Sequence, residues 1–120
     1  MIRPWPEIER FYGDLLPKLP DVPFREAFAA VQGLASSISD GPYASALFGW
    51  TSMHDLCIQQ VAVEPGSGPF LRISPQQDGD LEFRYQDTGI KARQWSRMVP
   101  PDQAAGRLDD FLDQLHWVPR

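Results

Sequence analysis

Residues 69–87 constrain the fold of this 120-residue chain more than any other segment. Two strand-like runs, PFLRIS and DLEFRYQD, flank the sequence PQQDGD, whose Asp-Gly step favours a tight hairpin turn. In the second run the apolar residues Leu81, Phe83 and Tyr85 alternate with polar ones, which predicts one buried face and one wet face. The segment therefore predicts an antiparallel hairpin whose apolar side is covered by other elements.

Two further segments are expected to extend this sheet. LCIQQVAVE, residues 56–64, precedes the turn sequence PGSGP, and ARQWSRMV, residues 92–99, follows the turn sequence DTG. The links between the four runs are short, whereas parallel neighbours need crossovers of a dozen or more residues, so the strands are expected to be antiparallel. Leu47–Ser52 is a candidate fifth strand.

Three segments have the periodicity of amphipathic helices: residues 5–16, residues 24–38 and a third from about 102 to 116. Proline suits the first turn of the first two, and Pro17 and the sequence SDGP end them. The predicted fold class is α+β, with the element order ααββββα. We expect one globular domain over residues 1–120, a two-layer arrangement in which about four antiparallel strands carry two N-terminal helices and one C-terminal helix on one face.

The charge of the chain restricts its partners. A formal charge of −5 and a pI near 4.8 disfavour nucleic acid, whose binding requires neutralisation of phosphates, and also disfavour anionic membranes. The same charge favours encounter with a basic protein. The sequence has no apolar run suited to a secretory signal or a bilayer span, and a single cysteine cannot form an internal disulfide. We therefore expect a cytoplasmic protein.

The stretch LFGWTSMHDLCIQQ, residues 47–60, raises the question of catalysis because Ser52, His54, Asp55 and Cys57 lie within six positions. If the chain is extended there, Ser52 and His54 share one face and Asp55 points to the other, which cannot form a Ser–His–Asp triad. Alternatively, Ser52 caps a short helix with Asp55 at its third position. A cysteine near a helix start can be nucleophilic, whereas its apolar neighbours favour a buried structural thiol.

Metal and phosphate sites are not indicated by the sequence. His54, Cys57 and His116 do not have the spacing of a zinc signature, and the remaining candidate ligands are carboxylates without recognisable spacing. The sequence EPGSGP lacks the Lys-Ser/Thr of a phosphate-binding loop. We expect neither a metal nor a cofactor.

The sequence RYQDTGIKARQWSR concentrates positive charge near Tyr85 and Trp95 in a chain that is acidic overall. In an extended conformation, Arg93, Trp95 and Arg97 project from the same side. Such a group could hold an anion, an acidic peptide or a base by charge and stacking. The alternative is that Trp95 packs on the sheet while the arginines pair with neighbouring carboxylates and cover apolar surface with their stems.

The last predicted helix carries three acidic residues close together, Asp109, Asp110 and Asp113. Asp109 and Asp113 are four positions apart, an arrangement of like charges that costs roughly 0.2–0.5 kcal/mol of helix stability. Its presence indicates either a requirement for solubility or an acidic docking surface.

Three functions are consistent with this sequence, which contains no recognisable catalytic constellation. The first is a protein-binding module that docks on a larger basic partner, for example as an inhibitor or immunity-type protein, and it predicts an exposed patch with aromatic residues. The second is a small enzyme that uses His54, Cys57 and Asp55 in a concave pocket. The third is a structural subunit of a homo-oligomer, which predicts an uncovered apolar face. We expect binding rather than catalysis.

Overall fold

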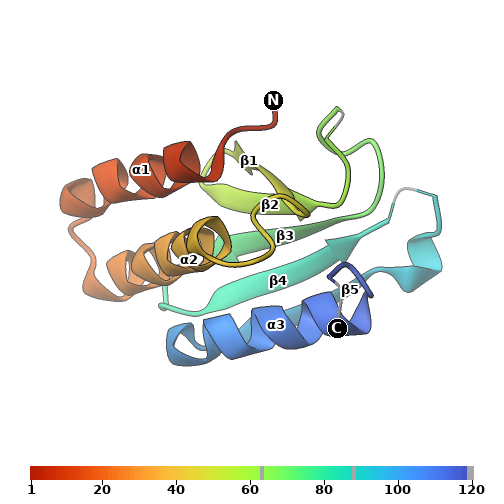
Figure 1. Cartoon of the computed structure of the whole chain (residues 1–120). Coiled ribbons are helices and arrows are strands. Elements are labelled where there is room, and N and C mark those ends of the chain that lie inside the picture. The colour runs from red at the N-terminus through yellow and green to blue at the C-terminus, as the bar shows by residue number, and fades with distance from the viewer. Residues whose placement is uncertain (63, 88, 119–120) are drawn as a thin grey trace.

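Five antiparallel strands form a single sheet in the order β1-β2-β3-β4-β5, so that every strand pairs with its neighbours along the chain. The computed structural model describes residues 1–62, 64–87 and 89–118, and in it three helices lie on one face of this sheet (Figure 1). The α+β class and the helix arrangement predicted from the sequence are confirmed. The strands are β1 (Phe48–Ser52), β2 (Asp55–Gln59), β3 (Phe70–Pro75), β4 (Leu81–Gln86) and β5 (Trp95–Val99).

The helices agree closely with the periodicity of the sequence. They are α1 (Trp5–Leu15), α2 (Val22–Asp40) and α3 (Ala104–Gln114). Short 3-10 helices extend two of them: η1 (Leu16–Lys18) contains Pro17 and ends the first helix, and η3 (Pro101–Gln103) leads into the last.

The core lies between the helices and one face of the sheet. The register places Leu71 opposite Tyr85 and Ile73 opposite Phe83, and these side chains are buried against the helices. The alternation of Leu81, Phe83 and Tyr85 thus produces the buried face that the sequence predicted. The helices contribute mainly Ile8, Tyr12, Phe28, Val31, Leu34, Leu108, Phe111 and Leu112 to this core.

The main differences from the sequence-based expectation are at strand ends. The sheet has five strands rather than about four, because Leu47–Ser52 does contribute a strand, β1. The strand expected over residues 56–64 is β2, which ends at Gln59; Val63 lies outside the described residues. The strand expected over residues 92–99 begins only at Trp95, because Arg93 lies in the 3-10 helix η2 (Lys91–Arg93).

The two edge strands of the sheet differ in how far other parts of the chain cover them. Strand β1 is one edge, and the N-terminal segment pairs with it, since the amide of Arg3 donates to the carbonyl of Gly49 at 2.9 Å. Strand β5 is the other edge, and its residues Ser96, Arg97 and Met98 are exposed. The chain therefore closes one edge of its sheet and leaves the backbone of β5 accessible.

The face of the sheet that the helices do not cover, called the outer face below, is partly covered by the segment that joins β2 to β3. The buried side chain of Gln59 holds this segment: its amide donates to the carbonyl of Val61 at 2.8 Å, and its side-chain oxygen accepts from the amide of Gly66 at 3.1 Å. Gly66 lies close to the ring of Phe70, which in turn contacts Trp50 at a centroid distance of 5.1 Å.

Candidate functional site

The chain reverses direction at Met53 and His54, which separates the candidate catalytic residues. Neither of the two conformations considered from the sequence is present: a two-residue turn joins β1 to β2, and Met53 has a φ of 56°. Ser52 and Asp55 are therefore paired across the two strands and share the outer face. The sequence predicted Asp55 on the other face of the strand from Ser52, on the assumption that the extended conformation continues through residues 53 and 54.

His54 belongs to the helix side of this turn. Its ring meets the ring of Phe28 edge-on at a centroid distance of 5.4 Å, and its carbonyl oxygen accepts a hydrogen bond from the hydroxyl of Tyr12 at 3.0 Å. The carboxylate of Asp55 instead binds Arg72, with an Nε–Oδ2 distance of 2.7 Å. His54 and Asp55 are therefore engaged with different elements and do not form a catalytic pair.

Cys57 is completely buried in the sheet. The pKa of its thiol is raised to about 12, chiefly by burial, with the positive charge of Arg72 opposing this effect. The thiol is consequently protonated at neutral pH, which is unfavourable for a nucleophile. The burial expected from its apolar neighbours is confirmed.

The buried thiol leads to a prediction about alkaline pH. Because the pKa of Cys57 is near 9.0 when unperturbed and about 12 in the folded protein, its contribution to stability is fully present below pH 9 and is lost as the pH rises above that value. The stability lost between pH 8 and pH 10, measured by urea unfolding, should be about 1 kcal/mol smaller in Cys57→Ala than in the parent protein. Both proteins retain the tyrosines, so an equal loss in the two would contradict the prediction.

The outer face carries a connected network of charged side chains. Arg72 and Arg84 lie directly opposite each other on β3 and β4, where like charges repel. Asp55 relieves this repulsion, with its Oδ2 at 2.7 Å from Arg72 and 3.7 Å from Arg84, and Glu82 lies 3.4 Å from Arg84. The two arginines are thus neutralised by two carboxylates. The hydroxyl of Ser74 accepts a further bond from Arg84.

A second group of cations lies where β5 meets α3. Trp95 and Arg97 both project to the helix side of the sheet, since they pair with the inward-facing Tyr85 and Phe83. The guanidinium of Arg97 lies over the Trp95 ring at 5.5 Å, and that ring contacts Phe111 of α3 at a centroid distance of 4.7 Å. Trp95 therefore packs on core aromatics, as one of the two sequence interpretations expected.

The structure adds a residue that the sequence reasoning missed. Arg107 on α3 places its guanidinium 5.1 Å from the ring of Phe111, so that two arginines flank the Trp95–Phe111 pair. The spacing of Arg107 and Phe111, four positions apart on a predicted helix, was the available signal. Arg93 lies in η2 and is close enough to Tyr85 to lower the pKa of its hydroxyl, although burial keeps that pKa above its usual value. We call the six residues the edge cluster: Tyr85, Arg93, Trp95, Arg97, Arg107 and Phe111.

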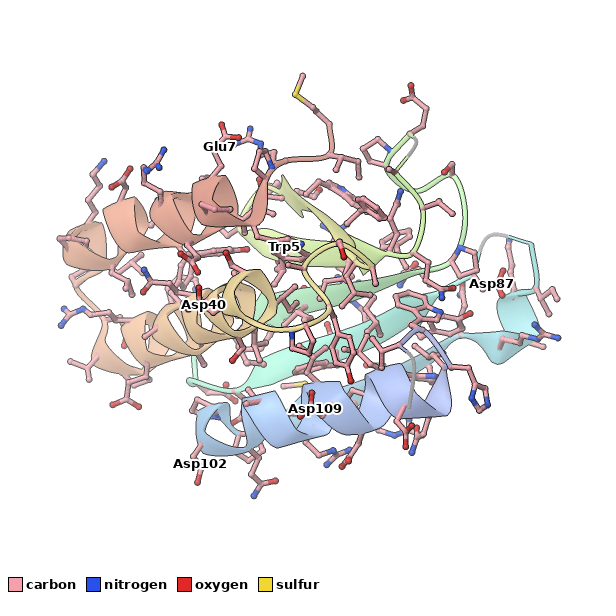
Figure 2. All side chains as sticks on the ribbon, viewed as in Figure 1. Trp5, Glu7, Asp40, Asp87, Asp102 and Asp109 are labelled. Carbon is pink, nitrogen blue, oxygen red and sulfur yellow. The ribbon has the colours of Figure 1, made fainter. Side chains whose placement is uncertain are left out.

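Two of the three acidic residues of α3, Asp109 and Asp113, lie on a different side of the helix from Arg107. At 100° per residue, Asp109 and Asp113 are rotated by about 200° and 240° from Arg107, whereas Asp110 is only about 60° away. Asp109 lines a groove of about 260 Å³ between α2 and α3, and Asp109, Asp110 and Asp113 are all exposed. In Figure 2, Asp102 and Asp109 lie along α3 on the helical side of the molecule. The two groups of binding candidates are therefore not brought together into one site.

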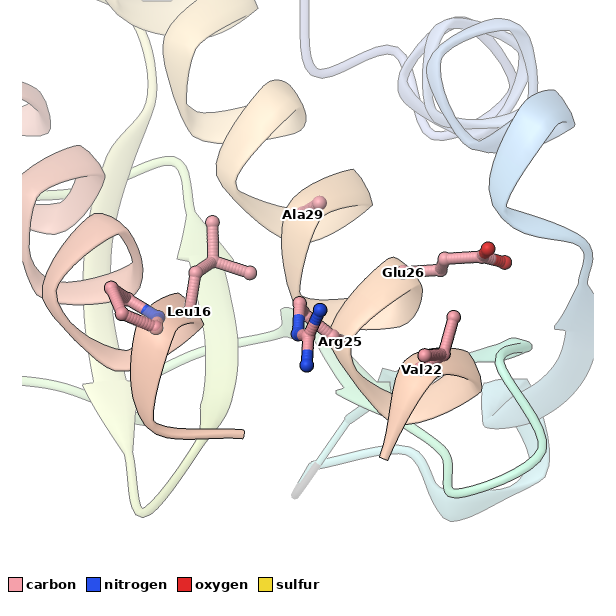
Figure 3. Close-up of a pocket in the computed structure, with 6 residues that line it drawn as sticks. Leu16, Val22, Arg25, Glu26 and Ala29 are labelled. Carbon is pink, nitrogen blue, oxygen red and sulfur yellow. The ribbon is translucent and has the colours of Figure 1, made fainter. Parts of the chain in front are cut away.

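Other depressions on the helical side contain none of the candidate residues. One of about 630 Å³ lies between η1 and the first half of α2 (Figure 3). Its Arg25 is already engaged, since the guanidinium donates to the carbonyl of Leu19 at 2.9 and 2.7 Å. The lining residues are Leu16, Pro17, Val22, Arg25, Glu26 and Ala29.

Within residues 1–62, 64–87 and 89–118, no three His, Cys, Asp or Glu side chains are arranged so that they could hold a metal ion. In the same part of the chain, no helix combines the length and the apolar character needed to cross a membrane. Comparison with known proteins identifies no relative: no family model matches the chain, and neither a curated protein nor a solved structure is significantly similar to it.

Proposed function

We propose that this protein is a small cytoplasmic binding module that docks on a larger basic protein through its helical side, as an inhibitor or immunity-type protein does. The observation that carries this proposal is the uneven distribution of charge between the two layers. The separation of His54 from Asp55 and the protonated, buried thiol of Cys57 favour binding over catalysis.

The negative charge of the chain is concentrated in the helical layer, by which we mean residues 1–47 and 101–118. These residues include ten carboxylates but only five Lys or Arg, whereas residues 48–100 include six carboxylates and five Lys or Arg. The formal charge is therefore −5 on the helical layer and −1 on the sheet and its loops. A field of one sign over one side of a small domain accelerates encounter with a partner of opposite sign and orients it.

The helical layer also contains a groove suited to part of a protein partner. The groove between α2 and α3 is bordered by apolar side chains such as Leu34 and Leu108 and by Asp109, with Asp110 and Asp113 exposed nearby on α3. Apolar surface surrounded by charge is the usual composition of a protein interface, where the rim gives rate and specificity while the centre gives affinity. The outer face of the sheet is less suited to a basic partner because its carboxylates Asp55 and Glu82 are already paired with arginines.

The proposal can be tested by a pull-down from lysate of the source organism at low and moderate salt, with three forms of the protein. In the first variant Asp109, Asp110 and Asp113 are replaced by Asn. We expect one stoichiometric basic partner that the parent protein retains at low salt and loses as salt rises. The triple variant should bind this partner at least about tenfold more weakly, mainly through a lower association rate.

The matched control changes the same amount of charge elsewhere. Glu64→Gln, Asp78→Asn and Asp80→Asn remove three carboxylates from the loops of the sheet, and this variant should bind the same partner within about twofold of the parent protein. Equal weakening by both variants would indicate a general charge effect and reject the helical layer as the docking surface. Recovery of no salt-sensitive basic partner by the parent protein would also reject the proposal.

A further inference from the structure

We propose that the edge cluster is a second binding site that accepts an acidic, extended segment of a protein, with carboxylates on Arg97 and Arg107. This site is distinct from the helical docking surface and does not depend on it. The argument rests on the placement of the two guanidinium groups, the packed aromatic pair that supports them and the accessible edge of β5.

The two arginines are held in place without being neutralised. Each guanidinium lies on an aromatic ring, Arg97 over Trp95 at 5.5 Å and Arg107 over Phe111 at 5.1 Å. In the part of the chain that the structure describes, neither forms an ion pair with a carboxylate, in contrast to Arg72 and Arg84 of the outer face. Stacking on a ring engages the face of the guanidinium and leaves N–H groups at its edge for a carboxylate. In Arg97 one terminal nitrogen already donates to the carbonyl of Ser96 at 2.8 Å, so a carboxylate would bind its remaining N–H groups.

The geometry of the cluster favours a chain with spaced carboxylates. The centroid distance between Trp95 and Phe111 is 4.7 Å, so the half-buried ring of Trp95 and the buried ring of Phe111 form one packed pair that supports both arginines. The distances along this row place the two guanidinium groups at most about 15 Å apart, a span that at most four or five residues of extended chain cover at roughly 3.3 Å per residue. An extended segment with carboxylates two or four positions apart can reach both.

Strand β5 offers such a segment a place to lie. In the described part of the chain it pairs with β4 on one side and with no strand on the other, and its residues Ser96, Arg97 and Met98 are exposed. Arg97 donates to the carbonyl of Ser96 at 2.8 Å, which ties its guanidinium to the backbone of this strand. A partner strand could pair with the backbone of β5 while its acidic side chains meet the arginines on the helix side.

The surrounding charge selects a peptide over a polyanion. Lys91 in η2 adds an exposed cation close to Arg93 of the cluster, yet the chain as a whole has a formal charge of −5. A dense polyanion such as a nucleic acid would be repelled by the acidic helical layer beside the site, whereas a short acidic segment exposes few charges to it. A shallow depression of about 280 Å³ at the ends of β4 and β5, lined in part by Tyr85 and Trp95, provides room for one of its side chains.

The test uses a fluorescein-labelled nonapeptide of alternating Glu and Ser and the same peptide with Gln in place of Glu. We expect the Glu peptide to bind saturably at low salt with a Kd below about 1 mM, and the Gln peptide to bind at least about tenfold more weakly. Amide and indole NMR signals of the ¹⁵N-labelled protein should shift at residues 95–98 and 104–111. A third peptide with N-methylated backbone amides at alternate positions should bind more weakly if the segment pairs with β5.

Variants of the protein test whether Arg97 and Arg107 bind the Glu peptide. Arg97→Gln with Arg107→Gln should weaken binding of the Glu peptide at least about tenfold, whereas Arg10→Gln with Lys18→Gln, which changes the net charge equally on the helical layer, should change it less than about twofold. Arg97→Lys with Arg107→Lys should restore only part of the affinity, because lysine lacks the planar fork. Asp109→Asn with Asp113→Asn, which leaves Asp110 beside Arg107 unchanged, should retain full peptide binding, which separates this site from the proposed docking surface.

Three results would overturn the inference: no saturable binding of the Glu peptide, equal binding of the Glu and Gln peptides, or equal weakening by the two charge-matched double variants. A single-stranded oligonucleotide that produced the same NMR shifts with higher affinity than the Glu peptide would also overturn it, because the cluster would then be a general polyanion site.

Discussion

Replacement of Phe28 by alanine is expected to lower the free energy of unfolding by about 3–5 kcal/mol, the range measured for buried phenylalanines in other proteins. Phe28 is fully buried in α2 and contacts three rings, those of Tyr12, Phe24 and His54, at centroid distances of 6.1, 4.8 and 5.4 Å. It thus joins both N-terminal helices to the turn between β1 and β2. Because small domains have total stabilities of only about 5–15 kcal/mol, this loss should be visible as a large shift in a urea unfolding curve.

Two other changes in the same aromatic group serve as controls. Phe24→Ala removes a ring that is only half-buried, so its cost should be about half that of Phe28→Ala. Tyr12→Phe removes the hydrogen bond to the carbonyl of His54 and keeps the ring, and its cost should be about 1 kcal/mol. If Phe28→Ala destabilised the protein no more than Phe24→Ala, the packing of α2 on the β1–β2 turn would differ from that described here.

The sequence predicted the elements well where one periodicity dominates. The apolar stripe of residues 24–38 could form only a helix, and the alternation at Leu81, Phe83 and Tyr85 could form only a half-buried strand, so both were recognised. The turn at Met53 and His54 was not, because neither residue is typical of a tight hairpin turn and Met53 has to adopt a positive φ. Because the turn was not predicted, Asp55 was assigned to the wrong face of the sheet. The conformation of residues 52–57 was also left undecided between strand and helix.

The sequence also identified only some of the residues of the candidate sites. The sequence identified Arg93, Trp95 and Arg97 because they are neighbours in the chain, and the structure places Trp95 and Arg97 in contact. Arg107 could not be associated with them, because its position depends on how α3 packs against β5, a contact between segments that periodicity does not specify. Likewise, the pairing of Asp55 with Arg72 depends on the register of β2 and β3.

The arrangement of α3 explains how an acidic chain can keep a cationic site. The helix packs its apolar side on the core and places Arg107 on Phe111, which contacts Trp95 of β5, while Asp109 lines the groove towards α2 and Asp113 lies one turn further along. Asp109 and Asp113 are therefore separated from Arg107 by about the width of one helix, whereas Asp110 lies about 60° from Arg107. At physiological ionic strength the screening length is about 8 Å, so charges on the two sides of a helix about 10 Å wide influence each other only weakly. Each surface can consequently be altered by substitution without abolishing the other.

A methyl group added at Gly49 is expected to destabilise the protein by about 1–3 kcal/mol, even though Ala is tolerated in most strands. A Cβ atom there would lie 2.7 Å from Cη2 of Trp5 and 2.9 Å from Cδ1 of Ile8, both buried residues of α1. Trp5 cannot easily move away, because its indole nitrogen donates to the carbonyl of Leu47 at 3.0 Å. Chemical unfolding of Gly49→Ala followed by tryptophan fluorescence measures this loss directly.

The matched control is Gly106→Ala on the exposed side of α3, where an added Cβ meets nothing within 4 Å. This change should stabilise the protein by about 0.5–1 kcal/mol, since alanine is the better helix former, so the two Gly→Ala substitutions should have opposite signs. If Gly49→Ala did not destabilise the protein relative to Gly106→Ala, the close approach of α1 to β1 would be contradicted. Because Gly49 lies at the closed edge of the sheet and the edge cluster at the accessible one, Gly49→Ala should leave binding of the Glu peptide unchanged under conditions in which the variant is folded.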